Sequence, residues 1–404
     1  MDTTAHLLLT LATVIVLGRI VGWAFGYIGQ PPVIGEVIAG IMLGPSLLGQ
    51  IAPGAPEWLL PPRVAPFLRE VAQLGVILYM FLVGLELNAS RLKQRAWATI
   101  AISHASIVVP FMLGVGLGLV LHKEFADDVP VTNFALFLGA AMAITAFPVL
   151  ARILTDRGMS KTDLGVMALA CAAAGDLTAW CLLAFVVGVA RAEVQGVVIV
   201  VLLSLAYVAA MFVVVQPICL RWASRYHGDD LPRGAIALVF VAVLLSALAT
   251  ELIGIHGLFG AFLLGAVIPH DSAVARVMTR KLEDLVTILL LPAFFAFTGM
   301  RTEIGLVSSL EDWLVCALII LVATAGKFGG AFISARLTGI GWRDAAALGL
   351  LMNTRGLMEL IALNIGLDMG IISPTVYAMM VLMALATTMA TSPLLHLVTP
   401  RPAP

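Results

Sequence analysis

The chain is a succession of long apolar runs, and this feature restricts its fold more than any other. A helix that crosses the hydrocarbon core of a bilayer needs about 20 predominantly apolar residues. Barrel strands are about 10 residues of alternating polarity, so the continuity of the runs excludes a membrane β-barrel. We therefore expect an all-α membrane protein with about 13 transmembrane helices. The thirteen runs are roughly 4–28, 31–49, 66–87, 97–121, 132–155, 162–190, 196–220, 233–255, 257–270, 285–304, 313–335, 345–367 and 373–398.

The composition excludes several other classes of protein. Of the 404 residues, 61% are hydrophobic and 12% are charged, against about 25% charged in an ordinary soluble domain. The 23 Lys and Arg residues are balanced by 24 Asp and Glu, which leaves no basic face for nucleic acid. The 4 cysteines lie in apolar runs without CxxC spacing and are interpreted as buried hydrophobic residues. We expect neither an enzyme nor a cofactor.

The distribution of basic residues predicts the orientation in the membrane. Fifteen Lys and Arg residues lie in the loops after odd-numbered spans and in the C-terminus, against five in the loops after even-numbered spans. Because cytoplasmic loops are enriched in Lys and Arg, we expect an extracellular N-terminus and a cytoplasmic C-terminus in the cell membrane. No soluble domain interrupts the runs, so a regulatory domain would be a separate cytoplasmic domain or subunit.

Two charged residues lie near the centres of their apolar runs. Asp176 is roughly fifteen residues from either end of the run 162–190, and Lys327 lies in the middle of 313–335. Charges at this depth are costly and therefore indicate function by default. Asp176 is interpreted as a titratable carboxylate that binds either a proton or a cation. The alternative is a structural ion pair with Lys327 that locks two helices together.

Two runs carry features of interrupted helices. Pro148 lies inside the run 132–155, where a proline frees a backbone carbonyl one turn earlier. The run 345–367 contains a polar stretch that includes Asn353, Thr354, Arg355 and Glu359. Matched interruptions indicate a midplane site made of half-helix ends, and they predict two inverted six-helix repeats joined by the seventh span. Arg355 and Glu359, four residues apart, are also able to pair with each other.

Several motifs resemble those of the monovalent cation:proton antiporter-2 family. The closest-looking branches are plant cation/proton exchangers and bacterial glutathione-gated potassium-efflux antiporters. The resemblance extends over essentially the whole chain, as the membrane domain alone. The segments that carry it are Thr145–Leu154, Gly175–Trp180, Gly35-Glu36, Gly44–Ser46, Phe81–Glu86 and Asn353–Leu360.

The resemblance implies a division of the chain and roles for its residues. It implies a dimerisation part at about 1–90 and 233–304, a core or transport part at about 91–191 and 310–398 with crossed broken helices, and a linker helix at about 196–223. Asp176 matches the family's ion-binding aspartate, Thr145 its broken-helix threonine and Lys327 its core lysine.

One departure from the family pattern concerns the residue before the aspartate. Members usually have Asp, Asn or Gln there, and this chain has Gly175. In electrogenic members that preceding aspartate partners the lysine, and Lys327 lacks such a partner here. We therefore expect one-for-one, electroneutral exchange.

The sequence thus predicts a homodimeric secondary antiporter that exchanges a monovalent cation, K⁺ or Na⁺, for H⁺ by an elevator movement. Dimerisation is expected through small residues around Gly40 and Gly44, which permit close helix contact in lipid. One alternative is a sodium-coupled symporter of an organic anion on a similar core. Another is a non-transporting sensor or channel subunit. An intramembrane hydrolase is disfavoured, because no Ser/His pair or metal-ligand spacing occurs at midplane depth.

Overall fold

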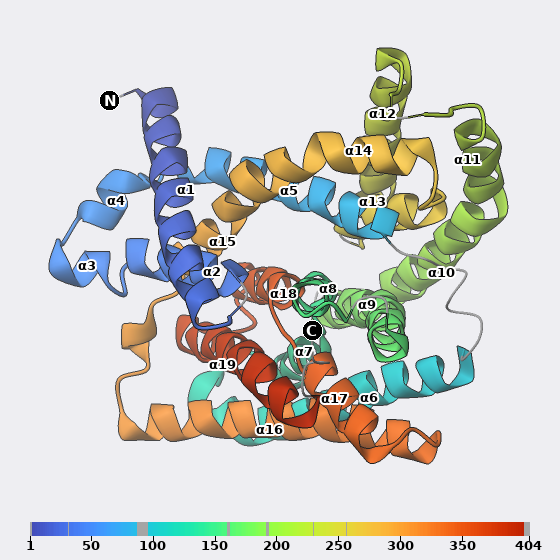
Figure 1. Ribbon diagram of the computed structural model, residues 1–404. Helices are drawn as coiled ribbons and strands as arrows, with labels where there is room; N and C mark the ends of the chain where they lie inside the picture. Colours follow the sequence, from blue (N-terminus) through green and yellow to red (C-terminus); the bar gives the residue numbers. More distant parts are fainter. Residues whose placement is uncertain are drawn as a thin grey trace. The chain divides into compact units, whose positions relative to one another are not determined.

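The protein is all-helical in the part of the chain that the structure describes (Figure 1). The computed structural model describes residues 2–30, 32–86, 96–159, 162–190, 194–228, 230–255 and 257–399. Within them, ten helices are long and apolar enough to cross a membrane, and Val131–Ala143 and Gly257–Val267 are shorter apolar helices. The expected all-α membrane fold is confirmed. The count of thirteen spans stays a prediction.

The contacts divide the chain into two compact units. Unit 1 comprises residues 1–16, 57–91 and 192–297, and unit 2 comprises residues 17–56, 92–191 and 298–404. Three helices contribute to both units, α1 (Thr3–Tyr27), the short α4 (Ala55–Leu59) and α15 (Leu291–Met300). The division places residues 17–56 with the expected transport part. The expected boundaries of the dimerisation part and of the transport part stay a prediction.

Unit 1 is built around the short, fully buried helix α13. Its glycines allow close crossings: a Cβ on Gly265 would lie 2.3 Å from the carbonyl oxygen of Phe81, and one on Gly260 would lie 2.1 Å from that of Ser246. Small residues let helices approach closely where no hydrophobic effect drives their association. The helices of unit 1 are α5 (Ala65–Glu86), α10 (Val194–Ala210), the π-helical turn η2 (Met211–Val215), α11 (Gln216–Ala223), α12 (Arg233–Ile253), α13 (Gly257–Val267), α14 (Ala273–Asp284) and the π-helical turn η3 (Leu285–Leu290). The short α4 (Ala55–Leu59) lies at its boundary.

Unit 2 contains the residues predicted to form the ion site. Its helices are α2 (Pro32–Leu43), α3 (Leu48–Ile51), α6 (Ala96–Phe125), α7 (Val131–Ala143), α8 (Phe147–Asp156), α9 (Asp163–Ala190), the 3₁₀ turn η4 (Ile304–Leu306), α16 (Leu310–Leu337), α17 (Trp342–Met352), α18 (Leu357–Asp368) and α19 (Pro374–Val398). The long helix α6 packs against α7, α9 and α16, and α16 also contacts α17 and α19 (Figure 1).

Glycines set the spacing between α6 and its neighbours. A Cβ on Gly330 of α16 would lie 2.6 Å from the carbonyl oxygen of Ala105, and one on Gly139 of α7 would lie 2.7 Å from that of Phe111. Gly326, one turn before Gly330, faces Pro110 in the same way. These contacts place Lys327, which follows Gly326, on a helix held tightly against α6.

The structure moves the start of one expected span. The run 285–304 is the second part of a longer helical stretch that begins at Ala273, in α14. Arg276, Arg280 and Lys281, which the sequence places in a loop, lie on this helix. The helix accommodates them because α14 is amphipathic: Val274, Val277 and Met278 are buried, while Arg280 is exposed.

The small residues around Gly40 and Gly44 are already used within unit 2. A Cβ on Gly44 would lie 2.9 Å from Cα of Met300, and one on Gly299 would lie 2.7 Å from the carbonyl carbon of Gly40. The expectation that this face is open for dimerisation is therefore wrong. The close contact that these glycines permit is made with the end of α15 and not with a second subunit.

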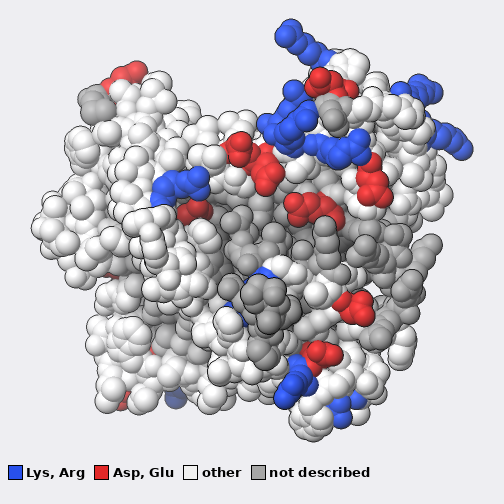
Figure 2. All heavy atoms as spheres, in the orientation of Figure 1, with Lys and Arg blue, Asp and Glu red and all other residues white. Residues whose placement is uncertain are grey.

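Basic side chains of unit 1 gather at one end of the unit. Figure 2 shows a surface with few charges, on which Lys and Arg lie mainly near the ends of α11, α12 and α14. Arg276 donates to the carbonyl oxygen of Gly228 (3.5 Å), and Arg280 lies 3.8 Å from Asp230. The loop after α11 therefore meets the first part of α14, as expected if both lie on the same side of the membrane.

Two neighbouring glycines of α16 give a matched test of this packing. We expect Gly330→Ala to lower the free energy of unfolding by about 1–3 kcal/mol, because its Cβ would overlap the backbone of α6. Gly329→Ala makes the same change where nothing lies within 4 Å, so it is expected to be neutral or slightly stabilising. Thermal unfolding of the two purified variants in detergent measures the difference, and equal losses of stability would contradict the packing.

Candidate ion-binding site

Two transmembrane segments of unit 2 are interrupted at the predicted places. Helix α7 ends at Ala143 and α8 begins at Phe147, while α17 ends at Met352 and α18 begins at Leu357. Pro148 is the second residue of α8, and its side chain lies outside the described part. Each interruption leaves backbone N–H and C=O groups without helical partners, and in lipid these groups must be satisfied by other protein groups.

The two interruptions bind each other. The backbone N–H of Ala146 donates to the carbonyl oxygen of Thr354 (3.0 Å), and the Thr145 hydroxyl donates to that of Met352 (3.5 Å). Gly356 permits this approach, because a Cβ on it would lie 2.8 Å from Cγ2 of Val149 in α8. Both segments are thus held at a single crossing.

Two buried cations cap the end of α7. Arg355 donates from Nη2 to the carbonyl oxygen of Met142 (2.9 Å) and from Nη1 to that of Ala141 (3.4 Å). The ammonium group of Lys327 donates to the carbonyl oxygen of Ala143. The C-terminal end of a helix carries a partial negative charge, so both cations lie where they stabilise the helix end.

Hydroxyl groups cap the end of α17 instead. Thr354 donates to the carbonyl oxygen of Leu351 (2.7 Å), and Thr391 of α19 donates to that of Leu350 (3.5 Å). Thr388 of α19 accepts from the backbone N–H of Arg355 (2.9 Å) and donates to its carbonyl oxygen (2.7 Å). These contacts fix the backbone from which the Arg355 side chain extends.

Arg355 and Glu359 form a fully buried ion pair. Arg355 Nη1 lies 3.1 Å from Glu359 Oε1, and both side chains are 0% exposed. The pairing that their spacing allowed is therefore confirmed. The second carboxylate oxygen of Glu359 and the side-chain oxygen of Asn353 have no hydrogen-bond partner among the described residues.

Asp176 is buried without a hydrogen-bond partner among the described residues. It is 3% exposed, and neither of its carboxylate oxygens is satisfied there. Its helix, α9, packs against α6, α7, α8 and α17. An unsatisfied buried carboxylate is expensive, and a proton or a cation at this group would relieve that cost.

The buried charges of unit 2 form one electrostatic cluster. Asp176 interacts with Lys327, and Lys327 also interacts with Arg355 and Glu359. Among the described residues, Glu36 is the other charged side chain that is buried. The structure thus brings together the predicted site residues Asp176, Lys327, Arg355 and Glu359 beside the interruption that contains Thr145.

The sequence interpretation missed the threonines of α19. Thr387, Thr388 and Thr391 are all buried, and two of them support the interruption after α17. A signal was available, because these polar residues recur at helical spacing within the apolar run 373–398.

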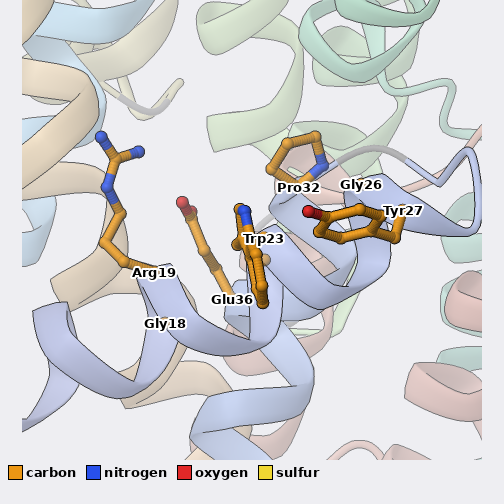
Figure 3. Close-up of a pocket in the computed structure, with 8 residues that line it drawn as sticks. Gly18, Arg19, Trp23, Gly26, Tyr27, Pro32 and Glu36 are labelled. Atoms are coloured by element: carbon orange, nitrogen blue, oxygen red, sulfur yellow. The ribbon is translucent and has the colours of Figure 1, made fainter.

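A separate groove of about 640 Å³ lies along α1 and α2. Figure 3 shows Arg19, Trp23, Tyr27 and Glu36 around it. It contains none of the residues predicted for ion binding. The groove is therefore distinct from the helix crossing.

Comparison with known proteins identifies the family. The family model described as sodium/hydrogen exchanger, transmembrane, matches residues 7–397. The chain belongs to this family. Its members are transporters rather than enzymes, and the resemblance read from the motifs is confirmed.

Individual relatives share different extents of the chain. The Na(+)/H(+) antiporter NhaS4 of Synechocystis sp. is 45% identical over 100% of both chains. Cation/H(+) antiporter 19 of Arabidopsis thaliana is 37% identical over 97% of this chain and 49% of its own. K(+)/H(+) antiporter 1 of Saccharomyces cerevisiae is 35% identical over 93% of this chain and 44% of its own. The chain spans about half the length of these plant and yeast relatives.

A solved structure supports the fold. The sodium proton antiporter MjNhaP1 from Methanocaldococcus jannaschii aligns with a TM-score of 0.68 over 96% of this chain and 94% of its own. The sequence identity is 16%, so this likeness concerns the arrangement of helices alone.

The buried ion pair gives a test of the site's architecture. Arg355→Met is expected to destabilise the protein by about 3–5 kcal/mol, because it leaves the Glu359 carboxylate buried without its ion-pair partner. The double variant Arg355→Met, Glu359→Met should lose less, since no charge is stranded. Arg69→Met is the control, because it removes an exposed pair with Glu70, a kind of pair that contributes about 0–1 kcal/mol. Unfolding in detergent measures all three, and a double variant less stable than the single one would contradict the pairing.

Proposed function

We propose that the protein exchanges a monovalent cation, K⁺ or Na⁺, for H⁺. The observation that carries this proposal is the buried carboxylate of Asp176, with no hydrogen-bond partner among the described residues, beside two interrupted helices. Membership of the sodium/hydrogen exchanger family, and relatives named as Na⁺/H⁺, K⁺/H⁺ and cation/H⁺ antiporters, support it.

Competition for one carboxylate couples the two fluxes. Ionised Asp176 binds a dehydrated cation, and protonated Asp176 releases it. The empty, ionised state is costly to move because a bare carboxylate would be carried through a low-dielectric region. Only the loaded states therefore cross readily, which makes the exchange obligatory. The ion gradients supply the driving force, so the proposal requires no cofactor.

An elevator movement of unit 2 is the proposed route across the membrane. The residues of the helix crossing lie in 92–191 and 298–404, within this single unit. A unit that holds the whole site is able to carry the bound ion as cargo. A stationary counterpart is needed for such a movement, and for this reason we propose a homodimer. We place it in the cell membrane with the N-terminus outside, because of the distribution of Lys and Arg among the loops. The contact between subunits must involve a surface other than the Gly40–Gly44 face, which is occupied by α15.

Replacing the carboxylate is the direct test of the exchange. We expect Asp176→Asn to abolish cation-dependent proton flux in proteoliposomes, because asparagine keeps the shape and removes both charge and titration. Asp163→Asn makes the same chemical change at the exposed start of the same helix and should leave the flux unchanged. Flux is read with a pH-sensitive dye while K⁺, Na⁺, Li⁺ and Rb⁺ are supplied in turn. Wild-type flux in Asp176→Asn would exclude the proposed mechanism.

The proposed stoichiometry is one proton per cation. Lys327 donates to the Ala143 carbonyl and interacts with the opposite charges of Glu359 and Asp176, and we take it as a fixed charge. Gly175 offers no second carboxylate. Transport of Na⁺ or Li⁺ should therefore be unchanged when the membrane potential is varied with valinomycin and K⁺ gradients. A reversal potential that fits two protons per cation would show that a second group carries a proton.

A further inference from the structure

Ser103 of α6 lies against the residue that precedes Asp176. A Cβ built on Gly175 would lie 3.2 Å from Oγ of Ser103 and 3.6 Å from Cδ1 of Ile107. One turn earlier, the Cys171 thiol contacts the carbonyl oxygen of Thr99 (3.6 Å). Helices α6 and α9 therefore run alongside each other, and Ser103 lies at the level of the ion-binding residue.

The hydroxyl of Ser103 is not used by its own helix. A serine inside a helix commonly donates to the carbonyl three or four residues earlier, as Ser106 does to Ser103 (2.7 Å). For Ser103 the corresponding carbonyl, that of Thr99, contacts the Cys171 thiol instead. Ser103 is 0% exposed, and its Oγ has no hydrogen-bond partner among the described residues.

Three buried oxygen atoms without hydrogen-bond partners among the described residues thus lie at one level of unit 2. They are Oγ of Ser103, which faces Gly175, and the two carboxylate oxygens of Asp176, which is the next residue of α9 and so lies at the same level of the helix. Each buried polar atom without a partner is costly, and apolar neighbours such as Ile107 offer no relief. A cation bound within reach of both side chains would satisfy all three, because a hydroxyl has lone pairs that serve as neutral ligands.

We propose that Ser103 Oγ is a ligand of the cation bound at Asp176 and sets the preference among alkali cations. This inference rests on the exchange proposed above. Gly175 has a direct role in it, because a side chain there would approach the hydroxyl and displace it. The second ligand is the neutral hydroxyl of Ser103 on α6, and Gly175 supplies no carboxylate. The cation therefore binds to a single negative charge, that of Asp176. A rigidly placed neutral ligand defines the size of the ion that fits, since selectivity depends on cavity size and on the number of ligand dipoles.

Two serines of α6 provide a matched experiment. Ser103→Ala should raise the half-saturating concentration of the preferred cation about tenfold, as expected for loss of one contact to a charged group, with the maximal rate retained. It should also change the order of the half-saturating concentrations of K⁺, Na⁺ and Li⁺, or the ratios between them. Ser106→Ala removes a hydroxyl that is equally buried but already satisfied, so its half-saturation and ion ranking should match those of the wild type.

Binding and transport are measured separately. Cations that bind the folded protein raise its thermal stability, so the concentration dependence of the stabilisation by each alkali chloride in detergent gives affinity without flux. Ser103→Cys is measured beside Ser103→Ala, because it keeps the side-chain volume while replacing the oxygen with a poor ligand for alkali cations. If the alanine variant does not fold, the cysteine variant decides the question by the same shift in affinity and ranking.

The outcomes distinguish this inference from the proposed function. Equal affinities and equal ion rankings in Ser103→Ala, Ser103→Cys and Ser106→Ala would overturn the role of Ser103 while leaving the exchange intact. A wild-type protein that shows neither exchange nor stabilisation by any alkali cation would overturn both. If stabilisation by alkali cations is lost in Asp176→Asn, is weakened in the Ser103 variants and is unchanged in Ser106→Ala, this supports the ligand assignment even if flux is absent.

Discussion

The hydrogen bond from Ala146 to Thr354 joins two interrupted helices, and the site depends on this crossing. A transmembrane helix that stops in the bilayer exposes backbone groups that lipid cannot satisfy. Here each interruption supplies partners for the other. Thr145 reaches the end of α17, and Arg355 reaches the end of α7. Neither broken segment would be stable alone, which explains why the same short region contains glycine, threonine and buried arginine.

The caps at the two helix ends differ, and the difference has an electrostatic consequence. Helix α7 ends on Lys327 and Arg355, whereas α17 ends on hydroxyls. Together with Glu359 and ionised Asp176, the two cations give a cluster whose formal charges cancel. A proton or a monovalent cation at Asp176 adds the same single charge. The two loaded forms of the proposed site are therefore electrostatically alike, which is what an electroneutral exchanger requires.

Sequence patterns located the unusual residues but not their partners. Asp176 and Lys327 were evident as charges deep in apolar runs, and the polar stretch at 353–359 predicted an interruption. The contact of Arg355 with Ala141 and Met142 depends on how two distant segments cross, which no local pattern encodes. The same limit explains the error at Gly40 and Gly44, since a small-residue face does not reveal whether it packs within or between subunits. The start of α14 was missed because charges on an amphipathic helix resemble a loop.

The capping network also bears on which kind of movement is feasible. A gate that opened by separating α8 from α18 would break the Ala146–Thr354 bond and pull Arg355 away from the α7 carbonyls. Buried charges would then lose their partners, at a cost of several kcal/mol for each. A movement of unit 2 as a whole keeps every one of these contacts, because all of them lie within that unit. On energetic grounds, the interrupted helices favour displacement of an intact site over local opening, and this is the physical basis for proposing an elevator.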